Sequence, residues 1–488
     1  MSTSLERIEY GFDRDSRRTW RRRMLATGED NAYGYDGLSQ VVNAARGNLN
    51  LNASAIAAVP VAAESWDYDP TGNWQGYHYA TTGTGAVTLD QSRVHDQGNR
   101  LTQVVGDPNP VTLDRAGRML EVPPGATGDW SKSLLVKWDA WNRIVEITNA
   151  DGSGVAGSYA YDGLTRRITR TVGSTTTQTY YSDAWRPLEE RTGSSTTPTL
   201  QYYWGARHRD DLVRRDSSTG GGTLNTTRYV LMDYFSPAAL TDETGAIKER
   251  YAFSAFGVRR ILSPTFTPVS TSECGFEFAF QGQFQDTESG LLNYGFRYYS
   301  PALGRWLCKD PLQEKAGWNL YGMVGNKPTL LVDFIGLSPS YWDVGYKAAL
   351  DAYNASMSAP QTRMGSTPEF CGLICCCDDG RNCATPPHKG SIDIDPIAHT
   401  ERGTCEPTRD ADGSTVRCPS NCNFAGTYHS HPSGDPTPSE NDWNGPRRTG
   451  QFIGGSQQGG VTHHIIGLPD STRKLPPLTK APTGTYCK

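Results

Sequence analysis

A short unit, in which a large residue precedes an aspartate, recurs between residues 12 and 168 and constrains the fold more than any other feature. Each aspartate is followed by two or three turn-forming residues, often by an arginine, and then by alternating apolar and polar residues. Asp, Asn and Gly favour tight turns, and such alternation is typical of half-buried strands. One hairpin buries little surface, so the array predicts hairpins stacked in a continuous β-sheet. The aspartates are Asp13, Asp36, Asp69, Asp96, Asp114, Asp139 and Asp162.

The bulk properties fit a polar, turn-rich chain of more than one domain. Its 488 residues exceed one ordinary core, and its 52 Gly, 30 Pro and 24 Tyr favour turns and aromatic strands over long helices. A formal charge of -5 gives no general reason to expect nucleic-acid binding. We find no apolar run long enough to span a membrane, and residues 1–25 are too charged for a signal peptide.

The cysteines mark a change of composition near residue 338. Only Cys274 and Cys308 precede that residue, and the other nine of the 11 cysteines follow it. Eight of those nine lie between Cys371 and Cys422. The shift predicts a separate C-terminal domain, whose cysteine pairing the sequence does not reveal.

A long motif from Phe280 to Leu337 follows the repeats, and it contains "GLLNYGFRYYSPALGRW", "KDP", "NLY" and "DFIGL". It resembles the RHS-associated core domain, and the repeats resemble the YD repeats of RHS proteins and of the C component of Tc toxins. The resemblance implies a mainly β fold, with a YD/RHS repeat shell over residues 1–250 and a core domain over 251–337 that plugs it. It also implies that the chain beyond, 338–488, is a toxin held inside.

The same resemblance implies that the core is a self-cleaving aspartyl protease. By motif match the two carboxylates are Asp310 and Asp333, with Arg297 beside them, and the cut follows Leu337. Two carboxylates that share a site have separated pKa values, so one can act as a base while the other stays protonated. The family has proline after the second aspartate, whereas this chain has Phe334, which lacks the fixed φ of proline. The alternative is that both aspartates only cap turns.

The C-terminal part predicts a small α/β domain. Apolar residues between Trp342 and Met357 recur at helical spacing, after a Ser-Pro-Ser start signal. Short strands are expected from Glu369, over 423–431 and over 461–469.

The stretch "HSHPSGDPTPSEND" combines His429, His431, Ser439 and Asp442 at fixed spacing. Residues i and i+2 of a strand point to the same face, so the two imidazoles can converge on one ion. A Pro/Gly-rich turn can bring Asp442 back to them. Two imidazoles and a carboxylate suit Zn²⁺ and leave a fourth position for water, as in catalytic zinc sites.

This spacing resembles the JAMM motif of the JAB/MPN metalloprotease superfamily. The resemblance implies that His429, His431 and Asp442 bind zinc, that Ser439 hydrogen-bonds the oxyanion, and that Glu369 is the general base. Other candidates for the base are Glu401, Glu406 and Glu440. The implied reaction is hydrolysis of an amide or isopeptide bond in a protein or peptide. The alternative is a cell-surface protein whose C-terminal domain is a metal-free recognition module; a nuclease is disfavoured because no basic cleft or nuclease motif is present.

The remaining expectations concern the cysteines, the N-terminal arginines and the export of the chain. The cysteines after residue 370 fit disulfides formed outside the cell, or a second, structural zinc. Residues 375–377 and 463–464 are expected in strands, and the arginines of residues 14–23 on a solvated strand face. A polymorphic toxin also implies export by a non-classical route and a cognate immunity protein. The short repeat array implies that a partner or a longer precursor supplies the rest of the shell.

Overall fold

The computed structural model describes residues 5–337 except 83–85, 87, 108–109, 126–127, 206–209 and 219–222, and beyond them the strands between residues 370 and 486. The chain divides into two compact units, Met1–Trp204 with Leu212–Ser338, and Gly205–Asp211 with Pro339–Lys488. The boundaries predicted at residues 250 and 337 stay predictions.

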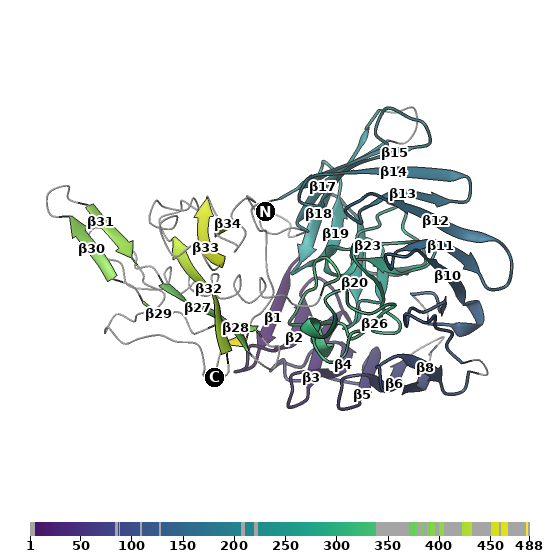
Figure 1. Ribbon diagram of the computed structural model, residues 1–488, viewed down its shortest axis with the longest axis horizontal. Helices are drawn as coiled ribbons and strands as arrows, with labels where there is room; N and C mark the ends of the chain where they lie inside the picture. The colour runs from purple at the N-terminus through teal and green to yellow at the C-terminus, as the bar shows by residue number, and fades with distance from the viewer. Residues whose placement is uncertain are drawn as a thin grey trace. The chain divides into compact units, whose positions relative to one another are not determined.

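The first unit consists of antiparallel sheets in which strands adjacent in sequence are adjacent in space (Figure 1). An eight-stranded sheet is formed by β1 (Ile8–Phe12), β2 (Arg18–Arg23), β3 (Asp30–Tyr35), β4 (Val41–Gly47), β5 (Ala62–Tyr68), β6 (Trp74–Thr81), β7 (Thr88–His95) and β8 (Leu101–Val104). This arrangement confirms the predicted mainly β fold with stacked hairpins.

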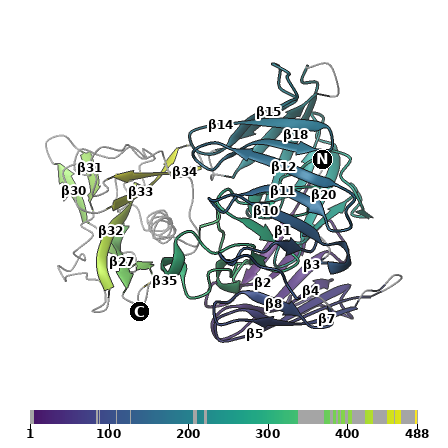
Figure 2. The same ribbon diagram turned by 45° about the vertical axis from the view of Figure 1, so that its right-hand side comes forward.

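A 14-stranded sheet continues the same up-and-down pattern, and Figure 2 shows its hairpins following one another. It is formed by β9 (Glu121–Val122), β10 (Leu134–Trp138), β11 (Ile144–Asn149), β12 (Val155–Tyr161), β13 (Arg167–Val172), β14 (Thr175–Tyr181), β15 (Pro187–Thr192), β16 (Leu200–Trp204), β17 (Leu212–Ser217), β18 (Thr226–Asp233), β19 (Ser236–Thr241), β20 (Ile247–Phe253), β21 (Arg259–Leu262) and β22 (Pro268–Val269).

The repeat aspartates build the hairpin turns, as expected. In the turn between β12 and β13, Oδ1 of Asp162 accepts hydrogen bonds from the backbone amides of Leu164 and Arg166, both at 2.9 Å. Its Oδ2 accepts one from Nε of Arg166 at 2.7 Å, and Thr165 takes a positive φ of 70°. The aspartate thereby replaces backbone partners that a tight turn leaves unpaired. The same bond to the amide four residues on recurs at Asp13, Asp36, Asp69, Asp96, Asp114 and Asp139.

Four further turns of this kind were missed by the sequence analysis. They begin at Ser182, Asp242, Ser254 and Ser263, each of which accepts a hydrogen bond from the amide four residues on. Serine replaces aspartate at three of them, so a search for aspartate alone could not find them.

An Asp162→Asn substitution is expected to lower the free energy of unfolding by about 1 kcal/mol at neutral pH, because it removes the Arg166 ion pair and keeps the Oδ1 acceptor. Burial acts to raise the pKa of Asp162, but the hydrogen bonds from Arg166 outweigh it and hold the pKa below 3.8. The stabilisation by the ionised Asp162 is present above the ordinary pKa of aspartate and is lost as pH falls through the lowered pKa of the folded state. The free energies of unfolding of the wild type and the variant should therefore become equal in strong acid. Urea unfolding at neutral and acidic pH measures this, with Asp15→Asn, whose side chain is 69% exposed, as control.

The arginines of β2 correct the expectation of a solvated face. Arg21 is 6% exposed and Arg23 is fully buried. Nη1 of Arg23 donates to the carbonyl of Tyr251 at 3.0 Å and Nη2 to that of Ala238 at 2.9 Å. Arg23 also pairs with Glu6, at 2.7 Å. The buried guanidinium therefore ties the eight-stranded sheet to β19 and β20 of the larger one.

The core segment contributes a small sheet and three of the four short 3₁₀ turns described in the first unit, and the fourth lies between β9 and β10. The sheet is formed by β23 (Phe284–Gln285), β24 (Leu292–Asn293), β25 (Tyr298–Ser300) and β26 (Arg305–Trp306). Arg93 of β7 donates to the carbonyl of Leu303, and Tyr299 donates to that of Phe256. The segment thus joins both large sheets; the 3₁₀ turns are η1 (Trp130–Lys132), η2 (Phe280–Gly282), η3 (Gln313–Ala316) and η4 (Val324–Asn326).

The described part of the second unit consists of strands. A mixed sheet has the order β34-β33-β32-β27-β28-β35, with β29 paired to β27, and β30 and β31 form a hairpin. The predicted helix over 342–357 lies outside the described residues. The strands are β27 (Phe370–Cys377), β28 (Asn382–Ala384), β29 (His388–Lys389), β30 (Ser391–Asp395), β31 (Thr400–Thr404), β32 (Cys422–His431), β33 (Gly450–Gln457), β34 (Gly460–Ile466) and β35 (Thr485–Tyr486).

Three expected strands are present with small shifts. The first, predicted from Glu369, begins at Phe370, while β32 and β34 cover the other two. Residues 375–377 and 463–464 lie in β27 and β34, as expected. No helix in the described residues is long and apolar enough to cross a membrane.

Candidate active site in the core segment

Arg297, Asp310 and Asp333 meet in the buried interior of the core segment, as the motif match predicted. Nη2 of Arg297 lies 2.8 Å from Oδ2 of Asp310 and 3.2 Å from Oδ2 of Asp333. The side chains of Arg297 and Asp310 are fully buried, and that of Asp333 is 1% exposed. One guanidinium nitrogen therefore holds both carboxyl groups, where low dielectric strengthens their interaction.

Asp333 also holds the chain that leads to the predicted cut. Its Oδ1 accepts hydrogen bonds from the backbone amides of Ile335, Gly336 and Leu337, at 3.3, 2.8 and 3.0 Å. The carboxyl group thus binds Arg297 through one oxygen and residues 335–337 through the other. It does cap a turn, and the amide of Leu337 is bound directly to one carboxyl group of the pair.

Asp310 caps a second turn with its other oxygen. Its Oδ1 accepts a hydrogen bond from the amide of Leu312 at 2.8 Å, and its own amide donates to the carbonyl of Leu320. Arg297 is fixed from a third side by the ring of Trp306, whose centroid lies 4.0 Å from the guanidinium carbon. The two turn caps leave little freedom to either carboxyl group.

The electrostatic environment raises the proton affinity of Asp333. Burial raises the pKa of Asp333 to about 6, Arg297 opposes this rise, and the negative charge of Asp310 adds to it. Cys308, the nearby thiol, has its pKa raised to about 12 by burial and stays protonated. A cysteine nucleophile is therefore disfavoured here, and acid–base work by the carboxylates is favoured.

The missing proline is replaced by tertiary contacts. The rings of Phe334 and Phe235 make an edge-to-face contact, with centroids 6.2 Å apart. The carbonyl of Phe334 accepts a hydrogen bond from Nε2 of Gln283 at 3.4 Å. Gly336 takes a φ of +74°, and a Cβ there would lie 2.9 Å from the backbone nitrogen of Arg297. Whether Phe334 permits cleavage stays a prediction.

Gln281 belongs to this site and was missed by the sequence analysis. Its Oε1 accepts a hydrogen bond from the amide of Asp333 at 3.2 Å, and its Nε2 donates to the carbonyl of Leu331 at 3.0 Å. The side chain thereby fixes the backbone on either side of residue 332. Its place in "FQGQFQD", at the start of the core motif, was the available signal.

The predicted zinc site is described only in part. His429 and His431 lie in β32, two residues apart, whereas Glu369, Ser439 and Asp442 lie outside the described residues. Of the other candidates for the base, Glu401 lies in β31, and Glu406 and Glu440 lie outside the described residues. Among described residues, no group of three or more metal-ligating side chains is gathered.

Known proteins are similar to this chain over about two thirds of its length. The chain is 25% identical over 360 residues to "Toxin subunit YenC1" of Yersinia entomophaga, covering 68% of this chain and 36% of the relative. It is 27% identical over 390 residues to "Toxin protein Tse5" of Pseudomonas aeruginosa, covering 68% and 27%. It is 26% identical over 340 residues to "Probable deoxyribonuclease RhsB" of Dickeya dadantii, covering 68% and 22%. The chain thus spans about a third or less of these relatives, and no family model matches it.

Solved structures show the same fold. The "Structure of Photorhabdus luminescens Tc holotoxin pore, Mutation TccC3-D651A" matches with a TM-score of 0.53 at 21% identity, over 69% of this chain and 17% of that one. The "Crystal Structure of TcdB2-TccC3" matches with a TM-score of 0.53 at 21% identity, over 68% and 17%. The stacked hairpins with aspartate turns define an RHS/YD-repeat shell. The first unit of this chain has a fold of this kind, and the chain is similar over about two thirds of its length to RHS-repeat toxin proteins.

Proposed function

We propose that the core segment cuts its own chain after Leu337 and so separates the repeat shell from residues 338–488. The observation that carries this proposal is that Asp310 and Asp333 share Arg297 while Asp333 also binds the amide of Leu337. A carboxylate pair with one raised pKa is the arrangement that aspartyl proteolysis requires.

In this reaction, Asp310 accepts a proton from a water molecule that attacks the carbonyl carbon of Leu337. Asp333 gives its proton to the nitrogen of Ser338 as the carbon–nitrogen bond breaks. Leu337 ends as a carboxylate and Ser338 as an amine. Arg297 and Gln281 act as positioning residues, because they fix the carboxyl groups and the backbone beside Asp333.

Cleavage is expected to slow as pH rises above about 6, because the pKa of Asp333 is raised to about 6 and deprotonation removes the proton donor. The full chain is expressed, incubated between pH 5 and 8, and followed by intact mass and N-terminal sequencing. Fragments of residues 1–337 and 338–488, formed fastest at the acidic end, are expected. A chain that stays whole at every pH, or a rate that rises with pH, contradicts the proposal.

For residues 338–488 we propose a toxin domain with zinc-dependent amide or isopeptide hydrolase activity. His429, His431 and Asp442 would hold the zinc, which when bound would acidify a water molecule. Support comes from the strand register: Cys371 pairs with His429, so β27 begins beside the histidine end of β32. Glu369 immediately precedes β27, where it would accept a proton from the attacking water, and Ser439 would donate to the oxyanion.

The full chain is expected to retain about one zinc ion per molecule after dialysis, and a His431→Ala variant to lose it. Elemental analysis measures this, with His388→Ala, from the edge strand β29, as the matched control. Zinc retained in the His431 variant would assign the metal to the cysteines, and a zinc-free wild-type chain would exclude the hydrolase.

As a polymorphic toxin, the chain would act on a protein or peptide substrate, leave the cell by a non-classical route and require an immunity protein. A solved relative is described as a TcdB2-TccC3 complex. By analogy we propose that a partner chain completes the repeat shell of this protein.

A further inference from the structure

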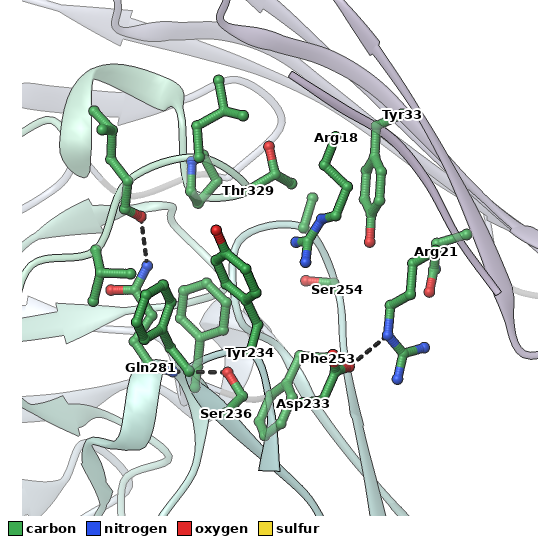
Figure 3. Close-up of a pocket in the computed structure, with 18 of the residues that line it drawn as sticks. Arg18, Arg21, Tyr33, Asp233, Tyr234, Ser236, Phe253, Ser254, Gln281 and Thr329 are labelled. Carbon is green, nitrogen blue, oxygen red and sulfur yellow. Dashed lines mark hydrogen bonds and ion pairs between the residues drawn. The ribbon is translucent and has the colours of Figure 1, made fainter. Parts of the chain in front are cut away.

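A partly open cavity of about 60 Å³ lies within the first unit, and of the residues assigned to the proposed cleavage only Gln281 lines it. Its walls come from β2, β3, the turn between β18 and β19, the end of β20, η2 and residues 328–332 (Figure 3). Charged and hydroxyl groups line it together with aromatic rings, so it is suited to a polar ligand with an apolar part.

The charges that line the cavity do not balance. Arg21 pairs with Asp233 at 2.5 Å, and Asp233 also accepts a hydrogen bond from the hydroxyl of Tyr10. Arg18 forms no ion pair with any described carboxylate, and its buried Nε has no hydrogen-bond partner among the described residues. The guanidinium of Arg18, a partly exposed residue, therefore faces the cavity with no hydrogen-bonded anion, although together with Arg21 it attracts the charge of Asp233.

A β-bulge in β2 directs Arg18 into the cavity. Gly11 pairs with Trp20, and Phe12 pairs with Arg18, so Thr19 is an extra residue. The bulge shifts the alternation by one and places Arg18 on the same face as Arg21, although they are three residues apart. Bulges commonly re-aim a side chain in this way.

Aromatic rings and hydroxyl groups complete the surroundings of Arg18. Its guanidinium carbon lies 5.6, 5.4 and 5.6 Å from the ring centroids of Tyr10, Tyr33 and Tyr234. Figure 3 shows the guanidinium directed toward Ser254 and the hydroxyl of Tyr234. Burial raises the pKa of Tyr33, so its hydroxyl remains a proton donor.

We propose that this cavity binds a carboxylate group, paired with Arg18 and carried on an apolar or aromatic body. The planar guanidinium matches a carboxylate with two parallel hydrogen bonds, and the neighbouring hydroxyls can donate to the same oxygens. A single negative charge neutralises the excess charge of Arg18. The cavity has room for the carboxylate, and the body of the ligand would extend through its open side, with the tyrosine and phenylalanine side chains of the wall as contacts.

The test measures binding of benzoate to the full chain by calorimetry at low salt, with benzamide as the uncharged analogue. Benzoate is expected to bind with a dissociation constant of about 1 mM, and benzamide at least about tenfold more weakly. In an Arg18→Gln variant benzoate should lose at least about tenfold in affinity. Arg22→Gln is the matched control, because Arg22 lies in the same strand and donates to the carbonyl of Asn50 instead.

Tyr234→Phe tests the site without altering any charge, in case Arg18→Gln does not fold. It removes only a hydroxyl and should weaken benzoate about threefold or more. Equal binding of benzoate and benzamide, unchanged binding in both cavity variants, or no benzoate binding to the folded wild type would overturn the proposal. A short peptide with a free C-terminal carboxylate, compared with its amide, then separates a peptide ligand from a small molecule; selective binding of either carboxylate supports the site.

Discussion

An Asp333→Asn variant is expected to remain one chain of 488 residues under conditions in which the wild type is cut after Leu337. Asparagine keeps an oxygen that can accept the amides of residues 335–337, so the turn is retained. It cannot deliver the proton that the leaving nitrogen needs. Loss of a general acid costs typically a factor of about 10² to 10⁴ in rate.

Gel electrophoresis and intact mass over a time course measure this loss. Asp15→Asn, at an exposed aspartate of the first hairpin turn, is the matched control and should cut at the wild-type rate. Asp310→Asn should also be slow, because the proposed base is removed. Wild-type cleavage in the Asp333 variant, with its circular dichroism unchanged, would rule out the carboxylate pair as the catalyst.

An Arg297→Gln variant is expected to lose about 3–5 kcal/mol of unfolding free energy at pH 7.5, because two buried carboxylates lose their shared cation. Loss of Arg297, which opposes the rise, should move the pKa of Asp333 further above its value of about 6. A carboxyl with a raised folded pKa contributes stability at low pH that is lost as pH rises through that pKa. The deficit should therefore shrink at pH 5.

Urea unfolding followed by tryptophan fluorescence measures this effect. The wild type and the variant are both examined in an Asp333→Asn background as well, so that cleavage does not alter the transition. Arg7→Gln, at an ion pair whose arginine is 61% exposed, is the control and should change stability by less than about 1 kcal/mol. An equal deficit at pH 5 and 7.5 in the Asp333-containing chain would contradict the electrostatic explanation.

The repeat turns were predictable because their interactions are local. Asp162 and its counterparts bond to amides two and four residues away, so the sequence window contains every partner. The turns at Ser182 and Ser254 were not predicted, because a serine hydroxyl accepts the hydrogen bond there in place of an aspartate carboxylate. Arg297, Asp310 and Asp333 were predicted from a long motif, although their sequence spacing alone does not bring them together.

The stacked-hairpin architecture and the residues of the candidate carboxylate site were predictable from the repeated unit and the core motif. Which polar side chains are buried, and what they contact, was not predictable without the three-dimensional arrangement of the sheets. Arg23 meets carbonyls more than 200 residues away, and Gln281 meets the backbone of Asp333 across 52 residues. The bulge at Thr19 reverses the face that alternation assigns to Arg18. These contacts depend on how whole sheets pack, and no local pattern of residues encodes that packing.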